Sequence, residues 1–154
     1  MGYALFTARK LSVTTRLNMC NANLACNTEK TYSLSNSIFV QQSKRDLELS
    51  TATQNAYSVY VKAVTTANEQ NKGNTEAINT AVSAADAVLQ KALKDAEAKQ
   101  TQSNVEIQKL NQKQTLLDQE RQRLQTQLNA YSNELSNVEK AEESAIKNST
   151  PKFS

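Results

Sequence analysis

Glycine and proline are almost absent from this 154-residue sequence, which contains 2 Gly and 1 Pro. These residues are the usual punctuation of turns, and a fold built from several short elements needs more of them. Gly2 and Pro151 lie near the ends, so Gly73 is the single strong break in the interior. The scarcity therefore predicts a few very long elements rather than a globule of many short ones.

Histidine and tryptophan are absent altogether. Without histidine the chain lacks the usual general base near neutral pH, and no phosphate-binding, zinc-protease or nucleophile-elbow motif occurs. We interpret Asp118, Glu120, Glu142 and Glu143 as parts of solvated, charged helix faces. The sequence predicts no enzyme, no catalytic residue, no cofactor, no metal site and no small-molecule substrate.

Charge and hydropathy exclude two further classes. The formal net charge is only +3, and no dense Lys/Arg cluster is interleaved with aromatic residues, so no nucleic-acid partner is expected. No apolar run approaches the ~20 residues of a transmembrane helix, so no membrane span is expected. Hydrophobic residues make up 38% and aromatic residues 5%, which is too little for a thick core. Such a chain can still be ordered if its apolar side chains form one stripe that is buried against another helix.

Such a stripe is present as a heptad ladder in the second half of the chain. Counting every seventh residue gives nine apolar or aromatic positions out of ten, the exception being Ser103. A strict seven-residue repeat keeps one seam of a helix facing a partner helix, so it predicts a coiled coil. The ladder consists of Val82, Leu89, Ala96, Ser103, Leu110, Leu117, Leu124, Tyr131, Val138 and Ala145.

The predicted fold is an all-α, elongated antiparallel helical hairpin that forms a single domain over residues 1–154. We expect a helix over 3–70, a turn over Asn71–Thr75, a second helix over 76–148 and a tail over 149–154. Gly73 suits the left-handed residue after a helix, and Asn74 or Thr75 suits the next N-cap. The alanine-rich segments 49–67 and 82–96 lie at matching distances from the turn, which independently favours the hairpin.

Two stretches leave alternatives open. Over residues 27–44, Ser and Asn favour local turns, yet apolar residues stay in phase. We expect a continuous helix, with a split near Ser33–Ser37 as the alternative. The acid-free N-terminal helix fits a mitochondrial transit peptide, a leaderless exported N-terminus or a solvated cationic face. We therefore expect one of two locations: extracellular or at the cell surface after leaderless export, or, as the alternative, cytoplasmic.

Apolar residues off the seam need a further partner, because each helix of a hairpin hides only one stripe. Tyr32, Phe39, Val40, Val105 and Leu116 are such positions, as is the apolar N-terminus. The expected partner is the chain itself, in an oligomer or filament, or another helical protein. The predicted assembly residues are Tyr3, Leu5, Phe6, Val13, Leu17, Leu24, Phe39, Leu117, Leu124, Leu128, Tyr131, Leu135 and Val138.

The amphipathic start Met1–Leu24 and the terminal heptads Leu124–Ala145 resemble the small helical proteins exported by bacterial type III secretion and flagellar systems. The resemblance implies terminal helices that pack together and polymerise into needles or filaments. Cys20 and Cys26 depart from that class, whose exported subunits generally lack cysteine. The leading hypothesis is a non-enzymatic, self-assembling structural protein, such as a filament or secretion-apparatus subunit. The alternative is an intracellular coiled-coil adaptor or chaperone that binds one protein partner.

Overall fold

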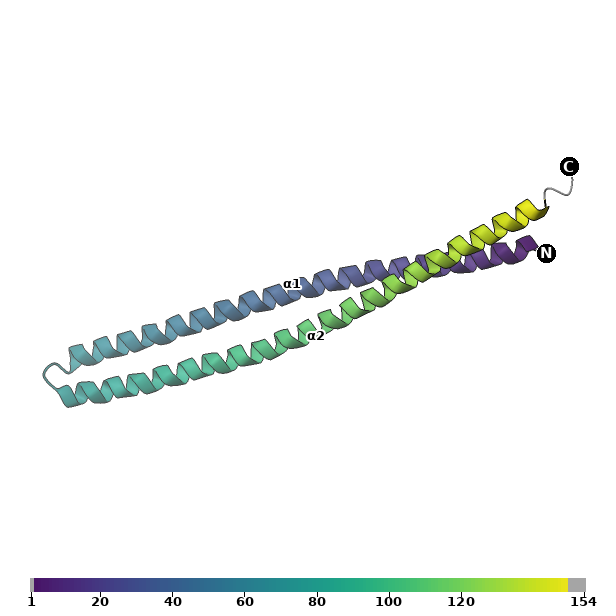
Figure 1. Cartoon of the computed structure of the whole chain (residues 1–154). Coiled ribbons are helices and arrows are strands. Elements are labelled where there is room, and N and C mark those ends of the chain that lie inside the picture. The colour runs from purple at the N-terminus through teal and green to yellow at the C-terminus, as the bar shows by residue number, and fades with distance from the viewer. Residues whose placement is uncertain (1, 150–154) are drawn as a thin grey trace. The chain divides into compact units, whose positions relative to one another are not determined.

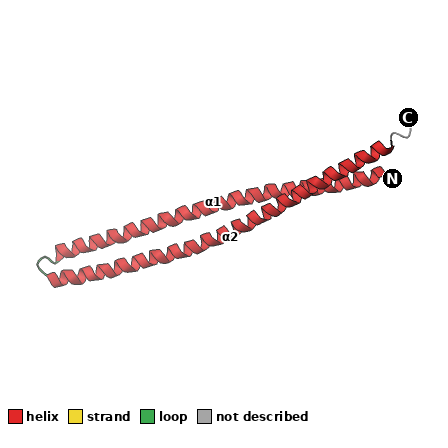
Figure 2. Ribbon diagram, viewed as in Figure 1, coloured by secondary structure: helices red, strands yellow, loops and turns green. Residues whose placement is uncertain are grey.

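Two long α-helices joined by a short turn make up the structure, a computed structural model that describes residues 2–149 (Figure 1). Helix α1 runs over Gly2–Gln70 and helix α2 over Thr75–Ser149. Figure 2 shows helix and turn but no strand in this part of the chain. The all-α helical hairpin is confirmed, with helix bounds within one residue of those predicted. The predicted tail from residue 150 onward lies outside the described residues.

Helix α1 is unbroken through the stretch where a split was the alternative prediction. Ser33–Ser37 contains neither glycine nor proline, so every backbone N–H remains available to the helix. The inward stripe also continues, since Thr31 and Leu34 are half-buried and Ile38 is buried. Burial of that stripe outweighs the weak local preference of serine and asparagine for turns.

The turn between the helices is stabilised by capping. The Asn71 N–H donates to the Ala67 carbonyl at 3.1 Å, and the Asn74 N–H donates to the Asn71 carbonyl at 2.9 Å. Gly73 has φ 84°, a conformation that costs other residues a clash with the following carbonyl. The Asn74 side-chain oxygen accepts the Ala77 N–H at 3.2 Å, so Asn74 is the N-cap of α2.

The hairpin consists of two compact units. The turn unit is Asn36–Gln112, and the terminal unit comprises the residues up to Ser35 and from Lys113 onward. In the terminal unit, the Cys20 thiol donates to the Leu124 carbonyl at 3.1 Å, and the Asn27 amide donates to the Leu117 carbonyl at 3.0 Å. A seven-residue step along α1 thus matches a seven-residue step back along α2. This is the antiparallel heptad pairing expected from the ladder.

The two units have different seams. The buried apolar residues of the terminal unit are Val13, Cys20, Leu124 and Val138. In the turn unit, four of the seven buried apolar residues are alanine. The seven are Ile38, Ala56, Ala67, Ala85, Leu89, Ala96 and Ile107. The predicted matching of the alanine-rich segments 49–67 and 82–96 is confirmed, because both contribute to the seam of this one unit.

Candidate interaction surface

The predicted assembly residues fall into three groups according to burial. Val13, Leu124 and Val138 are at most 2% exposed and are enclosed by the chain's own helices. A second group borders the seam and is half-buried: Phe6, Leu17, Leu24, Leu117, Leu128, Tyr131 and Leu135. Tyr3, Leu5 and Phe39 are exposed. With α1 and α2 paired in the hairpin, only the exposed group and the outer edges of the half-buried group offer surface to another molecule.

More large apolar side chains lie on the outside of the two helices than were predicted from the sequence. The positions predicted to lie off the seam, Tyr32, Phe39, Val40, Val105 and Leu116, are all exposed. Further examples in the described residues are Leu11, Met19, Leu47, Tyr57, Val59, Val61, Val88 and Ile146. Single apolar residues are normal on a protein surface, whereas contiguous apolar patches can mark interaction sites.

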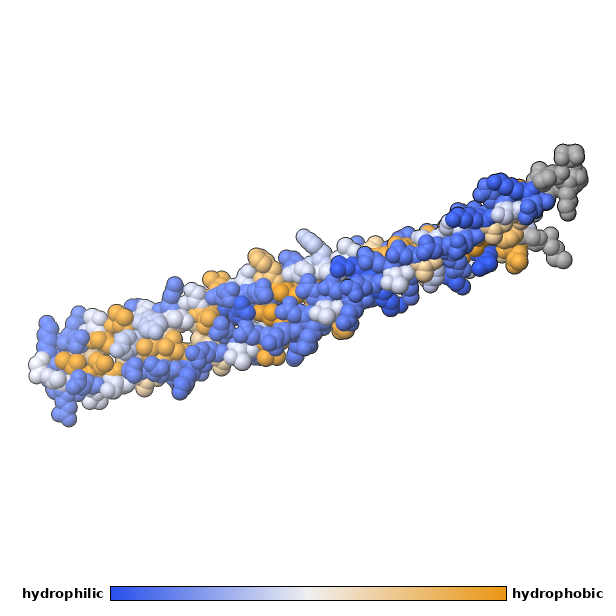
Figure 3. Space-filling view, in the orientation of Figure 1, coloured by the Kyte–Doolittle hydropathy of each residue, from blue (hydrophilic) through white to orange (hydrophobic). Residues whose placement is uncertain are grey.

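An apolar groove lies between the two helices of the turn unit. It has a volume of about 900 Å³ and is lined by residues between Ala52 and Gln70 of α1, by Asn71 of the turn, and by residues between Ala81 and Lys99 of α2. Its floor includes Ala56, Ala85 and Ala96, which are buried at the seam. Figure 3 shows hydrophobic residues, in orange, among the polar ones near the turn. The sequence indicates both alanine faces but not the hollow that their small side chains leave.

A polar layer interrupts the seam of the terminal unit. Asn27 is only 2% exposed, and its amide nitrogen donates to the Leu117 carbonyl, while its Oδ1 has no protein partner. One helical turn later, the buried Oγ1 of Thr31 also lacks a protein partner. Gln114 of α2 is half-buried and donates to the Ser35 hydroxyl at 3.1 Å. Asn27 was missed as a seam residue, although a heptad count from Val13 through Cys20 reaches it.

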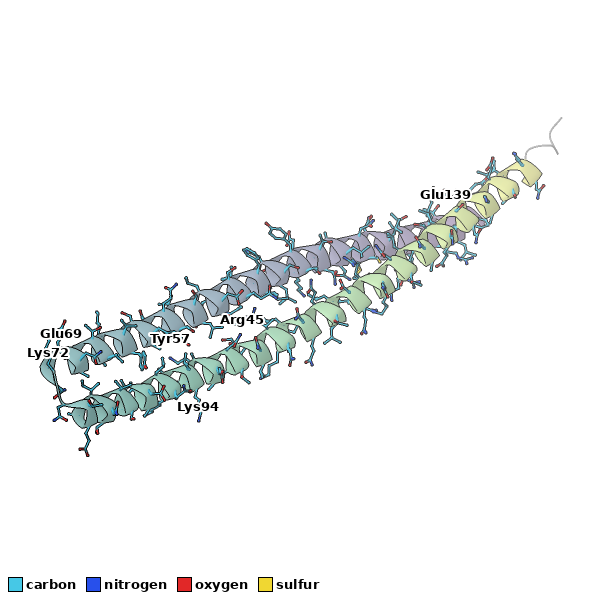
Figure 4. The ribbon with its side chains drawn as sticks, turned by 60° about the vertical axis from the view of Figure 1, so that its left-hand side comes forward. Arg45, Tyr57, Glu69, Lys72, Lys94 and Glu139 are labelled. Carbon is cyan, nitrogen blue, oxygen red and sulfur yellow. The ribbon has the colours of Figure 1, made fainter. Side chains whose placement is uncertain are left out.

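Charged side chains form exposed pairs rather than a cluster. Asp118 lies 3.2 Å from Arg121, and Glu143 lies 3.7 Å from Lys147, both within α2. In the turn unit, Arg45 extends from α1 and donates to the Asn104 side-chain oxygen at 2.8 Å (Figure 4). Exposed ion pairs such as those of Asp118 and Glu143 contribute ~0–1 kcal/mol each to stability. Residues 2–149 contain no group of three or more His, Cys, Asp or Glu side chains placed to hold a metal ion.

The two cysteines are free thiols in different surroundings. Cys20 is buried at the seam, where it acts as a small apolar residue with a weak donor. Cys26 is exposed. Both lie on α1, six residues apart and therefore on different sides of the helix, and of the two only Cys26 offers a thiol to reagents in solution.

Within residues 2–149, no helical stretch is both long and apolar enough to span a lipid bilayer. No known protein family, curated protein or solved structure matches this chain.

Proposed function

We propose that this chain is a non-enzymatic structural protein that assembles with copies of itself through its helix surfaces. The observation that carries the proposal is the set of exposed large apolar side chains on both helices. An amphipathic helix gains its stability in proteins from burying an apolar face. Here each helix buries one stripe in the hairpin and presents further apolar residues outside it. Contact between copies would remove those residues from water.

The finer form of the proposal is a bacterial filament or a subunit of a surface or secretion apparatus. It is supported by the resemblance of Met1–Leu24 and Leu124–Ala145 to exported helical subunits. Tyr3 and Leu5 are 56% and 70% exposed, so the N-terminal turn of α1 offers an apolar contact for a neighbouring subunit. A contact that joins different surfaces of successive copies and does not close generates a filament.

The test is the state of association of the purified full chain. Light scattering and analytical ultracentrifugation over a wide concentration range should show species heavier than the 17.0 kDa monomer, increasing with concentration. Negative-stain electron microscopy of the same samples would distinguish closed oligomers from filaments. A monodisperse monomer at all concentrations would refute self-assembly.

An intracellular adaptor or chaperone that binds one helical partner is the second candidate. The groove in the turn unit favours it, since a hydrophobic groove between two helices is a known mode of helix recognition. The exposed Cys26 thiol also supports a reducing compartment, where free cysteines persist. This candidate predicts a stoichiometric complex with a single partner and no polymer.

A further inference from the structure

The groove of the turn unit is open because its walls carry small side chains. Ala56 and Ala67 of α1 lie in the same seam as Ala85 and Ala96 of α2, and each is buried by the hairpin alone. Alanine adds a single methyl group to the seam, whereas helices commonly pack with axes 8–10 Å apart. The methyl groups leave part of the space between the helices unfilled. Apolar side chains from outside the hairpin are the physical complement of such a space.

Two exposed valines mark the middle of the groove. Val59 of α1 is 55% exposed and Val88 of α2 is 57% exposed, and both belong to the lining. They lie nearly the same number of residues from Gly73, so they are almost level across the two helices. Valines at the open side of an alanine groove are suited to enter an equivalent groove in a facing molecule.

The face around the groove is large enough for a stable contact between copies. The lining spans about 20 residues of α1, or ~30 Å at the helical rise of 1.5 Å per residue. Two packed helices are together ~20 Å wide, from their diameter and usual separation. The face therefore covers ~600 Å² per copy and ~1,200 Å² in a pair, the lower end of the range for specific interfaces.

The charges of the lining are compatible with a twofold pair of copies. Consider two copies that face each other across a twofold axis that runs perpendicular to the helices and passes near Val59 and Val88. In this arrangement α1 of one copy lies antiparallel over α1 of the other, and α2 lies antiparallel over α2. Lys62 of one copy is then set opposite Asn55 of the other, while Asp95 lies opposite Ala81. No two like charges of the lining meet in this arrangement, so desolvation there is not opposed by repulsion.

We propose that the groove of the turn unit is a docking face for the same face of a second copy, in an antiparallel twofold pair. The pair has four helices in two layers, in which Val59 and Val88 of each copy meet their counterparts and together cover the space between the alanines of both copies. This inference rests on the proposed function and specifies one of its contact surfaces. It places a contact in the turn unit, whereas twelve of the thirteen residues predicted from the sequence lie in the terminal unit.

A charge at the rim tests the docking face. Val59→Lys should raise the dissociation constant of the pair about tenfold or more, because it places an ammonium group in a desolvated contact. The matched control is Val61→Lys, which changes an equally exposed valine (58%) outside the groove lining. Ultracentrifugation should show weakened association for the first variant and wild-type association for the second, with equal helix content by circular dichroism. Equal association of both variants would overturn the docking face.

Cross-linking tests the antiparallel arrangement. In a Cys26→Ser chain, in which the remaining Cys20 is buried, Val59→Cys should give a covalent dimer with a short bismaleimide, while Val61→Cys should not. A parallel pair would place Val59 over Val88, so cross-linking only in a mixture of the Val59→Cys and Val88→Cys chains would overturn the antiparallel arrangement. A wild-type chain that stays monomeric refutes self-assembly itself. A chain that assembles regardless of Val59→Lys refutes only this face.

Discussion

Replacement of Asn27 by leucine tests whether the polar layer of the terminal unit costs stability. Asn27 occupies a seam position and is 2% exposed. Its amide nitrogen donates to the Leu117 carbonyl at 3.0 Å, and its Oδ1 has no protein partner. Leu117 lies in the interior of α2, where its carbonyl also accepts from the helix backbone. Removing the amide therefore leaves no orphaned group behind on α2.

Four effects decide the sign of the change in the free energy of unfolding. The lost hydrogen bond contributes ~1 kcal/mol net, whereas a buried polar atom without a partner costs ~1–3 kcal/mol. Burial of a leucine side chain adds ~1.5–3 kcal/mol, less ~1 kcal/mol or more if the larger side chain is strained. The sum favours the variant, so we expect Asn27→Leu to raise the free energy of unfolding by ~1–3 kcal/mol.

Urea unfolding followed by far-ultraviolet circular dichroism measures this difference, at a concentration where the chain is monomeric. The midpoint should rise while the denaturant dependence stays the same, which identifies a change in stability rather than in compactness. Asn23→Leu, one turn earlier on an exposed position of α1, is the matched control and should stay within ~0.5 kcal/mol of wild type. If Asn27→Leu is less stable than the wild type, the polar layer stabilises the hairpin and the reasoning is wrong.

The remaining predictions concern the seam and the turn, and each is measured by the same urea unfolding. Leu124→Ala should destabilise the chain by ~2–5 kcal/mol because it opens a cavity at a residue 2% exposed, while the exposed Leu116→Ala should change it by under ~0.5 kcal/mol; equal effects would contradict the seam. Gly73→Ala should cost ~1–2 kcal/mol through its positive φ alone, since an added Cβ meets no atom within 4 Å; an unchanged midpoint would contradict the turn geometry. Asn74→Ala should lower the free energy of unfolding by ~0.5–2 kcal/mol because it removes the N-cap of α2. Asn74→Asp should retain most of the stability, since a carboxylate also caps a helix; an equal loss in both variants would show that the N-cap is not the cause.

The sequence predicted the hairpin well because its main signals are one-dimensional. Gly73 is the only interior residue with a strong preference for a positive φ, so the turn had one possible place. The heptad ladder determined which side of α2 is inward, and nine of its ten residues are buried or half-buried, the exception being the exposed Ala145. Periodicity records the direction of each side chain, and in a two-helix fold direction nearly determines burial.

The features that the sequence did not predict depend on the distance between helices. Asn27 and Thr31 are polar, so they do not register in an apolar repeat, and only the pairing with α2 encloses them. The groove beside Ala56 and Ala85 likewise requires two alanine stripes held side by side. A periodic pattern indicates that such residues face a neighbour. It contains no information on how much space remains when they meet.

The unequal quality of the two helical stripes bears on which surfaces remain for assembly. The leucine ladder of α2 is regular, whereas its mate in α1 contains Cys20, Asn27 and Thr31, so a second α2 ladder would be the better apolar partner. The short turn opposes that exchange, because tethering gives α1 an effective concentration in the millimolar range. The less regular apolar stripe of α1 is therefore sufficient to pack against the leucine ladder of α2 within one chain. The proposed assembly would then use the apolar side chains left outside the hairpin, such as Val59, rather than buried ladder residues such as Leu124.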